Sequence, residues 1–282
     1  MWFLFAILSF LLWGMADLFY KKGNMDSDED SHYKTGIAVG VVMGIHATLY
    51  LIIKQPSIEL LDIIKYFPVS FCYIASMIIS YKGLRYLELS IASPIENAGG
   101  VITALLVILF FHEKLGDLEW FGIILIAFGV LCLSQLEKKK VNLKKVSLLL
   151  IIFPLLYAIL DGIGTFLDSI YLDKLEIVTE DSALICYEYT FLIYALTLLA
   201  IFIFKKKKKI KLKQEKDKIY AALFETAGQF FYVFAMASHS VITAPVVGSY
   251  SIVSILLSRI FLKEKLSRHK YIAIFIIRSE EH

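Results

Sequence analysis

Long apolar stretches separated by short polar segments dominate the pattern of this sequence. A helix needs roughly 20 apolar residues to cross the hydrocarbon core of a bilayer. We therefore predict membrane-spanning helices over residues 2–20, 35–53, 66–86, 90–111, 118–136, 147–171, 182–204, 218–238 and 241–262. The apolar run over 269–277 has about half the required length, which predicts an incomplete tenth span. The predicted fold is thus all-α and polytopic.

The two halves of the chain repeat each other at a fixed offset. Pro94 corresponds to Pro245, and Glu113-Lys114-Leu115 corresponds to Glu264-Lys265-Leu266, both at 151 residues. An ungapped apolar run lies between each proline and the turn that follows it. A self-match at a fixed period indicates a duplicated structural unit.

The duplicated unit contains five spans, and this number fixes its orientation. We predict repeats over 1–136 and 147–282, joined by a basic linker over 137–146. Five is odd, so consecutive copies must insert with opposite orientations. The sequence therefore predicts two inverted five-helix repeats.

Composition and charge support this topology. Hydrophobic residues make up 58% of the chain, against about 45–50% apolar residues in soluble domains. The net charge is only +3, but most Lys and Arg residues follow the odd-numbered spans. The positive-inside rule places these segments, including Lys205–Lys209, in the cytoplasm and the N-terminus outside. We predict a multi-pass protein of the cell (inner) membrane, without a soluble domain that could bind nucleic acid.

The sequence lacks the motifs of disulfide-bonded, metal-binding and enzymatic proteins. Cys72, Cys132 and Cys186 all lie in apolar runs, where core packing is the better interpretation than disulfides or metal ligation. We find no paired catalytic carboxylates, histidine cluster or nucleophile elbow. The sequence therefore predicts no metal, no cofactor and no enzymatic activity.

Acidic residues inside the spans are the main candidates for function. A charged side chain at the centre of a span costs about 2.5–3.5 kcal/mol on insertion scales. Almost no basic residues are available in the spans to pair with these acids, so they are either protonated or meet a cation or proton in a wet cavity. For the two nearest to helix ends, Asp17 and Asp168, solvation is the stronger interpretation. The set comprises Asp17, Glu96, Asp161, Asp168, Glu188 and Glu225.

Neighbouring polar residues strengthen three of these candidates. Asp161 shares a helix face with Tyr157, Thr165 and Asp168, and Glu225 shares one with Gln229. Glu96 and Asn97 lie in the segment 94–100, which is poor in helix formers. This segment is interpreted either as irregular backbone that lines a cavity or as a plain helix start with proline in its first turn.

Two further features concern packing. Gly36, Gly40 and Gly44 leave one face of the second span bare, which predicts close contact with another helix. Tyr250 is interpreted equally as an aromatic residue of a cavity wall or as a packed or interfacial tyrosine. His46, beside the glycine face, is interpreted as a packing residue.

The duplicated pattern of small residues, proline, long apolar helix and Glu-Lys-Leu turn resembles the EamA-type transporters of the drug/metabolite transporter superfamily. Trp13-Gly14 and the Gly122…Gly129 helix fit the same resemblance, which covers nearly the whole chain. It implies ten helices in two inverted repeats around a central cavity lined by spans 3, 4, 8 and 9. Spans 1, 2, 6 and 7 would move, and spans 5 and 10 would be peripheral. Members carry amino acids, sugars, nucleotides, purines or drugs.

Three features depart from that family pattern. The tenth span is short, the lysines place the N-terminus outside, and the spans carry many acids. The acids favour a cationic or amine-bearing substrate or proton antiport.

The combined hypothesis is a secondary-active exporter or exchanger of a small metabolite or drug-like solute, working by alternating access with proton coupling. Its partners would be the substrate, protons and the lipid bilayer, and it would be a monomer or homodimer. A lipid or lipid-linked-sugar flippase is the alternative, which a cavity open sideways would favour; a membrane enzyme or a non-transporting scaffold ranks lower. The predicted substrate-binding or proton-coupling residues are Glu96, Asn97, Asp161, Glu188, Glu225, Gln229 and Tyr250.

Overall fold

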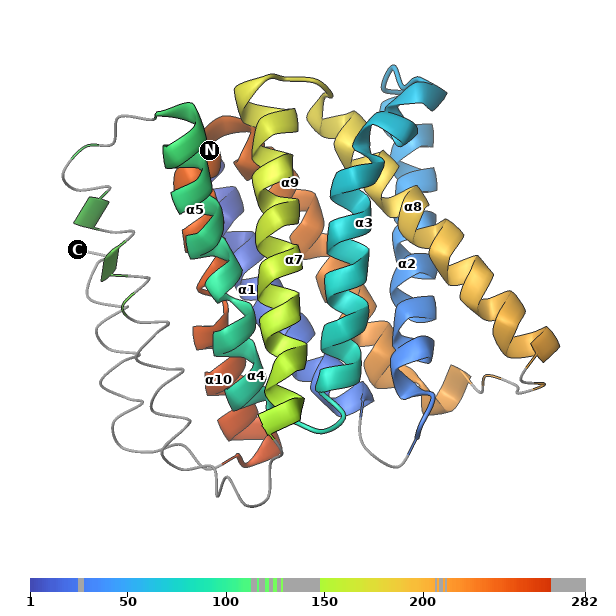
Figure 1. The fold of residues 1–282 in the computed structure, drawn as a ribbon. Helices are drawn as coiled ribbons and strands as arrows, with labels where there is room; N and C mark the ends of the chain where they lie inside the picture. Colours follow the sequence, from blue (N-terminus) through green and yellow to red (C-terminus); the bar gives the residue numbers. More distant parts are fainter. Residues whose placement is uncertain are drawn as a thin grey trace.

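The computed structural model describes residues 1–24, 28–112, 116, 120–121, 124–125, 128, 148–205, 207, 210 and 212–264. All regular structure in these ranges is helical (Figure 1). The first half contains α1 (Trp2–Gly23), α2 (Ser31–Lys54), α3 (Leu60–Gly83), α4 (Leu89–Glu96) and α5 (Ala98–Phe111). The second contains α7 (Ile152–Ser169), α8 (Glu180–Ala200), α9 (Lys216–Gly248) and α10 (Ser251–Leu257). Short 3₁₀ or π turns cover Leu148–Ile151, Ile170–Lys174, Ile201–Lys205, Leu212–Gln214 and Ser258–Leu262.

Membrane-length helices follow the predicted spans. Seven helical stretches in the described part of the chain are long and apolar enough to cross a membrane. The last of them, Lys216–Leu262, has 47 residues and is non-helical at His239, where two helices meet at a kink. This stretch therefore holds two of the predicted spans. The predicted tenth span, the linker, and most of the fifth span with Gly122, Gly129 and Cys132 lie outside the described residues.

Corresponding helices of the two halves run in opposite directions. In Figure 1, α1 descends from the N-terminus whereas its counterpart α7 ascends, and α2 ascends whereas α8 descends. Helix α1 packs along α9, α3 along α7, α2 along α8, and α5 along both α7 and α9. By the sequence repeat, α1 corresponds to α7, α2 to α8, and α3 to the first part of α9. If the two halves are exchanged, the α1–α9 contact becomes the α7–α3 contact, and the α2–α8 contact stays the same. These helix directions and contacts are those expected if the two halves are inverted repeats.

Proline lies inside a helix in both of the spans that the sequence repeat pairs, the fourth and the ninth. Pro94 lies inside α4, and the helix breaks at Asn97 before α5 begins. Because α4 starts at Leu89, the interpretation of Pro94 as a first-turn proline is wrong. Pro245 likewise lies inside α9, which ends at Gly248. Proline has no N–H to donate, so each leaves one carbonyl of the preceding turn without its helical partner.

The glycine face of α2 lies against α8. A Cβ atom added to Gly40 would lie 2.4 Å from the carbonyl oxygen of Phe191. At Gly44 the nearest atom would be Leu192 Cδ2 at 2.6 Å, and at Gly36 it would be Tyr194 Cε1 at 3.1 Å. The two backbones approach this closely only because side chains are missing there.

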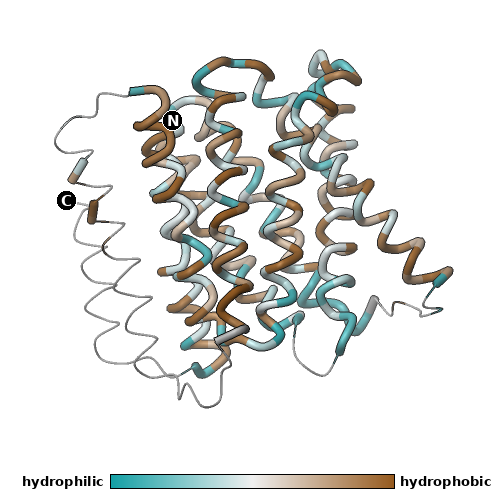
Figure 2. Tube along the Cα trace, in the orientation of Figure 1, coloured by the Kyte–Doolittle hydropathy of each residue, from teal (hydrophilic) through white to brown (hydrophobic). Residues whose placement is uncertain are grey.

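The outer surface has the polarity expected of a protein in a bilayer. Large apolar side chains such as Ile52, Phe71, Leu109 and Ile193 are more than half exposed. Figure 2 shows hydrophobic residues along the helices and hydrophilic residues towards both ends of the bundle. Lipid chains would cover such exposed side chains.

The lysine distribution makes a testable prediction about orientation. Lys213 is exposed in the connection before α9, and Ser57 is exposed in the connection between α2 and α3, at the other end of the bundle (Figure 1). In a variant without the native cysteines, Ser57→Cys is expected to react with an impermeant maleimide in intact cells. Lys213→Cys is expected to react only after lysis, because the positive-inside rule places the Lys-rich segments in the cytoplasm. The reverse labelling would overturn the orientation without affecting the fold.

Candidate functional site

A cavity of about 770 Å³, counting space open to solvent, lies at the centre of the bundle. Helices α1, α3, α4, α5, α7, α8 and α9 all contribute to its wall. The lining carries four carboxyl groups, those of Asp17, Glu96, Asp161 and Glu225. Among the described lining residues there is no Lys, Arg or His. The cavity is therefore acidic and has no basic side chain of its own to balance the acids.

Aromatic rings form much of the remaining wall. The lining includes Trp13, Tyr20, Tyr73, Tyr81, Tyr157, Tyr187, Tyr232 and Tyr250. The indole of Trp13 lies 4.9 Å from the ring of Tyr232 and 5.9 Å from that of Tyr250, measured between centroids. Its Nε1 donates to the carbonyl oxygen of Glu225 at 3.3 Å. One wall is thus a continuous aromatic surface with a fixed orientation.

Two of the carboxyls are bound to hydroxyl groups from other spans. Asp17 Oδ2 accepts from Ser93 Oγ and from Ser254 Oγ, each at 2.7 Å. These serines lie on α4 and α10, so Asp17 joins the two proline-interrupted spans. Glu225 Oε2 accepts from Tyr20 at 3.2 Å, and Tyr81 donates to the Tyr20 oxygen at 3.1 Å.

Three buried polar atoms of the cavity residues have no hydrogen-bond partner among the described residues. They are Glu96 Oε1, Asn97 Nδ2 and Gln229 Nε2, on side chains only 2%, 4% and 3% exposed. A buried polar atom that forms no hydrogen bond costs about 1–3 kcal/mol. Native structures keep few such groups, and those they keep call for an explanation such as water or a ligand.

Asp168, on α7, is a further buried carboxyl group close to the cavity lining. Asp168 is fully buried and accepts from the hydroxyl groups of Tyr66 and Tyr73. The Tyr73 hydroxyl also lies 3.1 Å from Thr165 Oγ1 and 2.9 Å from the Tyr232 oxygen. Asp168 does not line the cavity, but this chain of hydroxyls connects it to Tyr73 and Tyr232, which do.

Most of the predicted site residues come together in this cavity. Glu96, Asn97, Asp161, Glu225, Gln229 and Tyr250 all line it. Glu188 does not: both of its carboxylate oxygens lie 2.8 Å from His46 Nδ1, where α8 packs against α2. Asp17 is a cavity residue although its place near a helix end favoured simple solvation.

The structure also changes which helices form the wall. The family resemblance implied spans 3, 4, 8 and 9, but α1, α7 and α8 contribute as well. The residues are Trp13, Asp17 and Tyr20 on α1, Tyr157, Asp161 and Thr165 on α7, and Tyr187 on α8. Sequence reasoning did not single out the tyrosines of α3 or Trp13 as site residues. A tyrosine in an apolar span resembles a packing residue, and only the rotation of its helix decides what it faces.

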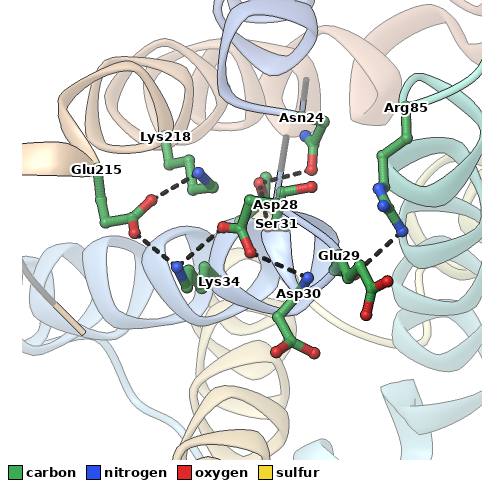
Figure 3. Close-up of polar contacts among 10 residues, drawn as sticks. Asn24, Asp28, Glu29, Asp30, Ser31, Lys34, Arg85, Glu215 and Lys218 are labelled. Atoms are coloured by element: carbon green, nitrogen blue, oxygen red, sulfur yellow. Dashed lines mark hydrogen bonds and ion pairs between the residues drawn. The ribbon is translucent and has the colours of Figure 1, made fainter. Parts of the chain in front are cut away.

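An ionic network closes the lower end of the bundle (Figure 3). Lys34 Nζ lies 2.8 Å from Asp28 and 3.0 Å from Glu215, and Lys218 lies 2.5 Å from the same glutamate. Arg85 Nη1 donates to the Glu29 carbonyl oxygen at 3.0 Å. The network links the ends of α1 and α3 to the starts of α2 and α9.

Asp28, in the connection between α1 and α2, remains ionised in this network. Partial burial by itself would raise the pKa of Asp28. Hydrogen bonds from Lys34 and from the Asp30 N–H outweigh that effect, so the pKa lies below its usual value of 3.8. The ion pair therefore persists at neutral pH and is lost only as the pH falls through that lowered pKa.

The repeated Glu-Lys-Leu turn has a structural role at its second copy. Glu264 Oε1 accepts from the N–H of Leu89 at 3.1 Å, and Oε2 accepts from the N–H of Ser90 at 3.0 Å. These N–H groups have no partner within α4, because they belong to its first turn. Glu264 thus caps the start of span 4 from the end of span 9; Glu113 lies outside the described residues.

The fold and cavity define the class: a polytopic, all-helical membrane protein with an acidic polar cavity inside its bundle. The chain belongs to the EamA-like transporter family, which it matches over residues 1–135 and 148–278. This is a family of transporters rather than of enzymes. Within the described residues, no group of three or more His, Cys, Asp or Glu side chains is placed to hold a metal ion.

Comparison with other known proteins supports the fold alone. No curated protein matches the chain. One solved structure, described as "Crystal structure of protein", superposes with a TM-score of 0.71 at 10% sequence identity. The match covers 99% of this chain and 94% of the other.

Proposed function

We propose that this protein is a secondary-active transporter that exports or exchanges a small solute by alternating access, with proton coupling. The observation that carries the proposal is the central cavity, to which both halves of the chain contribute carboxyl groups. Asp17 and Glu96 come from the first half, and Asp161 and Glu225 come from the second. Ionisable groups inside a membrane bundle mark substrate or ion pathways by default.

The helix contacts that exchange of the two halves would interconvert support alternating access. If the halves are inverted repeats, the arrangement that closes the cavity at one face has an alternative that closes it at the other. Exchange of the halves maps two contacts onto themselves: that of α2 with α8, and that of the fourth span (α4 and α5) with the ninth (the end of α9 and α10). These two interfaces are therefore the candidates for the surfaces about which the halves would move.

Each end of the cavity has a polar closure that would have to open in turn. At the lower end the closure consists of the Tyr20–Glu225 hydrogen bond and the Lys34–Glu215 ion pair. At the upper end it is the cluster of Asp168 with Tyr66 and Tyr73. Hydrogen bonds and ion pairs suit this purpose, because water replaces them when the closure opens.

Proton coupling would use the cavity glutamates. A substrate cation entering the cavity would displace the proton of Glu96 or Glu225, which would leave to the aqueous side that is open at that moment. Release of the substrate at the other face would allow the carboxylate to take up a proton there. One proton would then cross the membrane against each substrate cation, so charge is balanced.

Purified protein in liposomes tests the proposal. A metabolite extract is added on one side under an imposed pH gradient, and the vesicle contents are identified by mass spectrometry. We expect specific solutes to accumulate, with dissipation of the pH gradient reported by a trapped dye. Protein-free liposomes and collapse of the gradient by an ionophore are the controls. If no solute moves, or if fluorescent lipid is scrambled instead, the proposal is wrong; the second result would favour the flippase.

A further inference from the structure

We propose that the cavity is an organic-amine site, selective for a protonated amine on an aromatic or apolar body that also carries a neutral oxygen acceptor. The inference rests on the proposed function in one respect: the ligand is a substrate only if the protein is a transporter. It goes further by assigning the class of molecule and the atoms that would recognise each part of it.

The charge of the cavity selects the ammonium group. Four carboxyl groups line the space, and the described lining offers no cation to neutralise them. Asp17 is already bound by two serine hydroxyls, Glu225 by Tyr20 and Asp161 by Tyr157. Glu96 Oε1, in contrast, has no partner among the described residues. Glu96 is therefore the carboxyl most available to accept from an N⁺–H donor, a bond about twice as strong as a neutral one.

The aromatic wall favours a cation that carries an organic body. Trp13 lies between Tyr232 and Tyr250, and its indole is held by the carbonyl of Glu225. A Cβ on Gly228 would lie 2.4 Å from Trp13 Cδ1, so the glycine leaves the space that this ring occupies against α9. A ring in a fixed position next to an acid attracts an organic cation through its π face.

The two amides select the neutral acceptor. Asn97 Nδ2 and Gln229 Nε2 are buried donors without a partner among the described residues. They call for acceptor oxygens on the ligand, but a carboxylate in that place would meet the negative charge of the surrounding acids. A hydroxyl, carbonyl or ether oxygen accepts the same bonds without that repulsion. Free amino acids, which carry a carboxylate, are therefore disfavoured.

Four related small molecules test the assignment one group at a time. Tyramine carries a ring, an amine and a hydroxyl; phenethylamine lacks the hydroxyl, 4-ethylphenol lacks the amine, and tyrosine adds a carboxylate. Binding to the purified protein in nanodiscs is measured by calorimetry. We expect tyramine to bind at least tenfold more tightly than 4-ethylphenol or tyrosine, and measurably more tightly than phenethylamine. Saturable tyramine binding should fall at least tenfold in Glu96→Gln, with Glu176→Gln, an exposed glutamate, as the matched control.

The outcomes separate this inference from the transport proposal. Equal binding of tyrosine or 4-ethylphenol, or no saturable binding of tyramine to the unmutated protein, would overturn the amine assignment. The ligand series on the unmutated protein decides this even if Glu96→Gln does not fold. Amine-selective binding without flux in liposomes would sustain the amine site and refute the transporter. Proton-coupled flux of solutes that are not amines would do the reverse.

Discussion

Glu225→Gln is expected to abolish proton-coupled transport while the protein remains folded in the membrane. Glu225 is buried in the cavity wall and its carboxylate accepts from Tyr20. Glutamine has nearly the same shape and can still accept that bond through its amide oxygen, so packing is preserved. It cannot take up or release a proton, and it does not attract a cation. Glu96→Gln is expected to have the same effect, since Glu96 lines the same space.

Two matched variants distinguish the cavity from burial in general. Glu188→Gln removes a carboxyl that is just as buried but contacts His46 away from the cavity, and we expect its flux to persist. Glu176→Gln changes an exposed glutamate and serves as the control for handling and expression. The measurement is solute flux in liposomes driven by a pH gradient, normalised to inserted protein. Undiminished flux in both cavity variants would reduce Glu225 and Glu96 to packing residues.

Gly40→Ala is expected to destabilise the protein more than any other alanine substitution on the glycine face of α2. The added Cβ would lie 2.4 Å from the Phe191 carbonyl oxygen and 2.5 Å from Ala195 Cβ. Neither atom belongs to a flexible side chain end, so α2 and α8 must move apart. Overpacking of this kind costs about 1–3 kcal/mol. Because one kcal/mol shifts the Tm by about 2–4 °C in a domain of 150–250 residues, a loss of several degrees is expected.

The other two glycines of this face are internal controls. At Gly44 the new Cβ would meet the end of the Leu192 side chain, which can change rotamer, so we expect a smaller effect. At Gly36 the nearest atom would be 3.1 Å away on the Tyr194 ring, and the substitution should be nearly neutral. Thermal loss of the monodisperse protein in detergent measures the series. Equal melting of all three variants would contradict the close approach of α2 and α8 at Gly40.

If α2 moves against α8 during transport, Gly40→Ala should also slow transport beyond its effect on stability. Flux at a temperature where both proteins are fully folded separates the two effects. This would connect the packing of the α2–α8 interface with the proposed movement of the halves.

The sequence by itself determined the membrane spans, because a run of apolar residues of the right length has one stable location in a bilayer. It also predicted the duplication, since Pro94 and Pro245 stand at the same offset as the two Glu-Lys-Leu turns. The acids were visible as candidates because charge is costly at that depth. The location of the spans and the choice of candidate residues could thus be predicted from the chemistry of each residue alone.

Only the tertiary structure decided which of these residues meet. The spans are apolar on nearly every side, so the pattern does not reveal how each helix is rotated about its axis or which helix is its neighbour. Packing placed Asp17 and Glu225 on the cavity and turned Glu188 to His46, although all three are acids at comparable positions along their spans. It also gathered Trp13, Tyr73 and Tyr232, far apart in the chain, into one wall. Contacts between distant spans depend on packing in three dimensions, which no local pattern encodes.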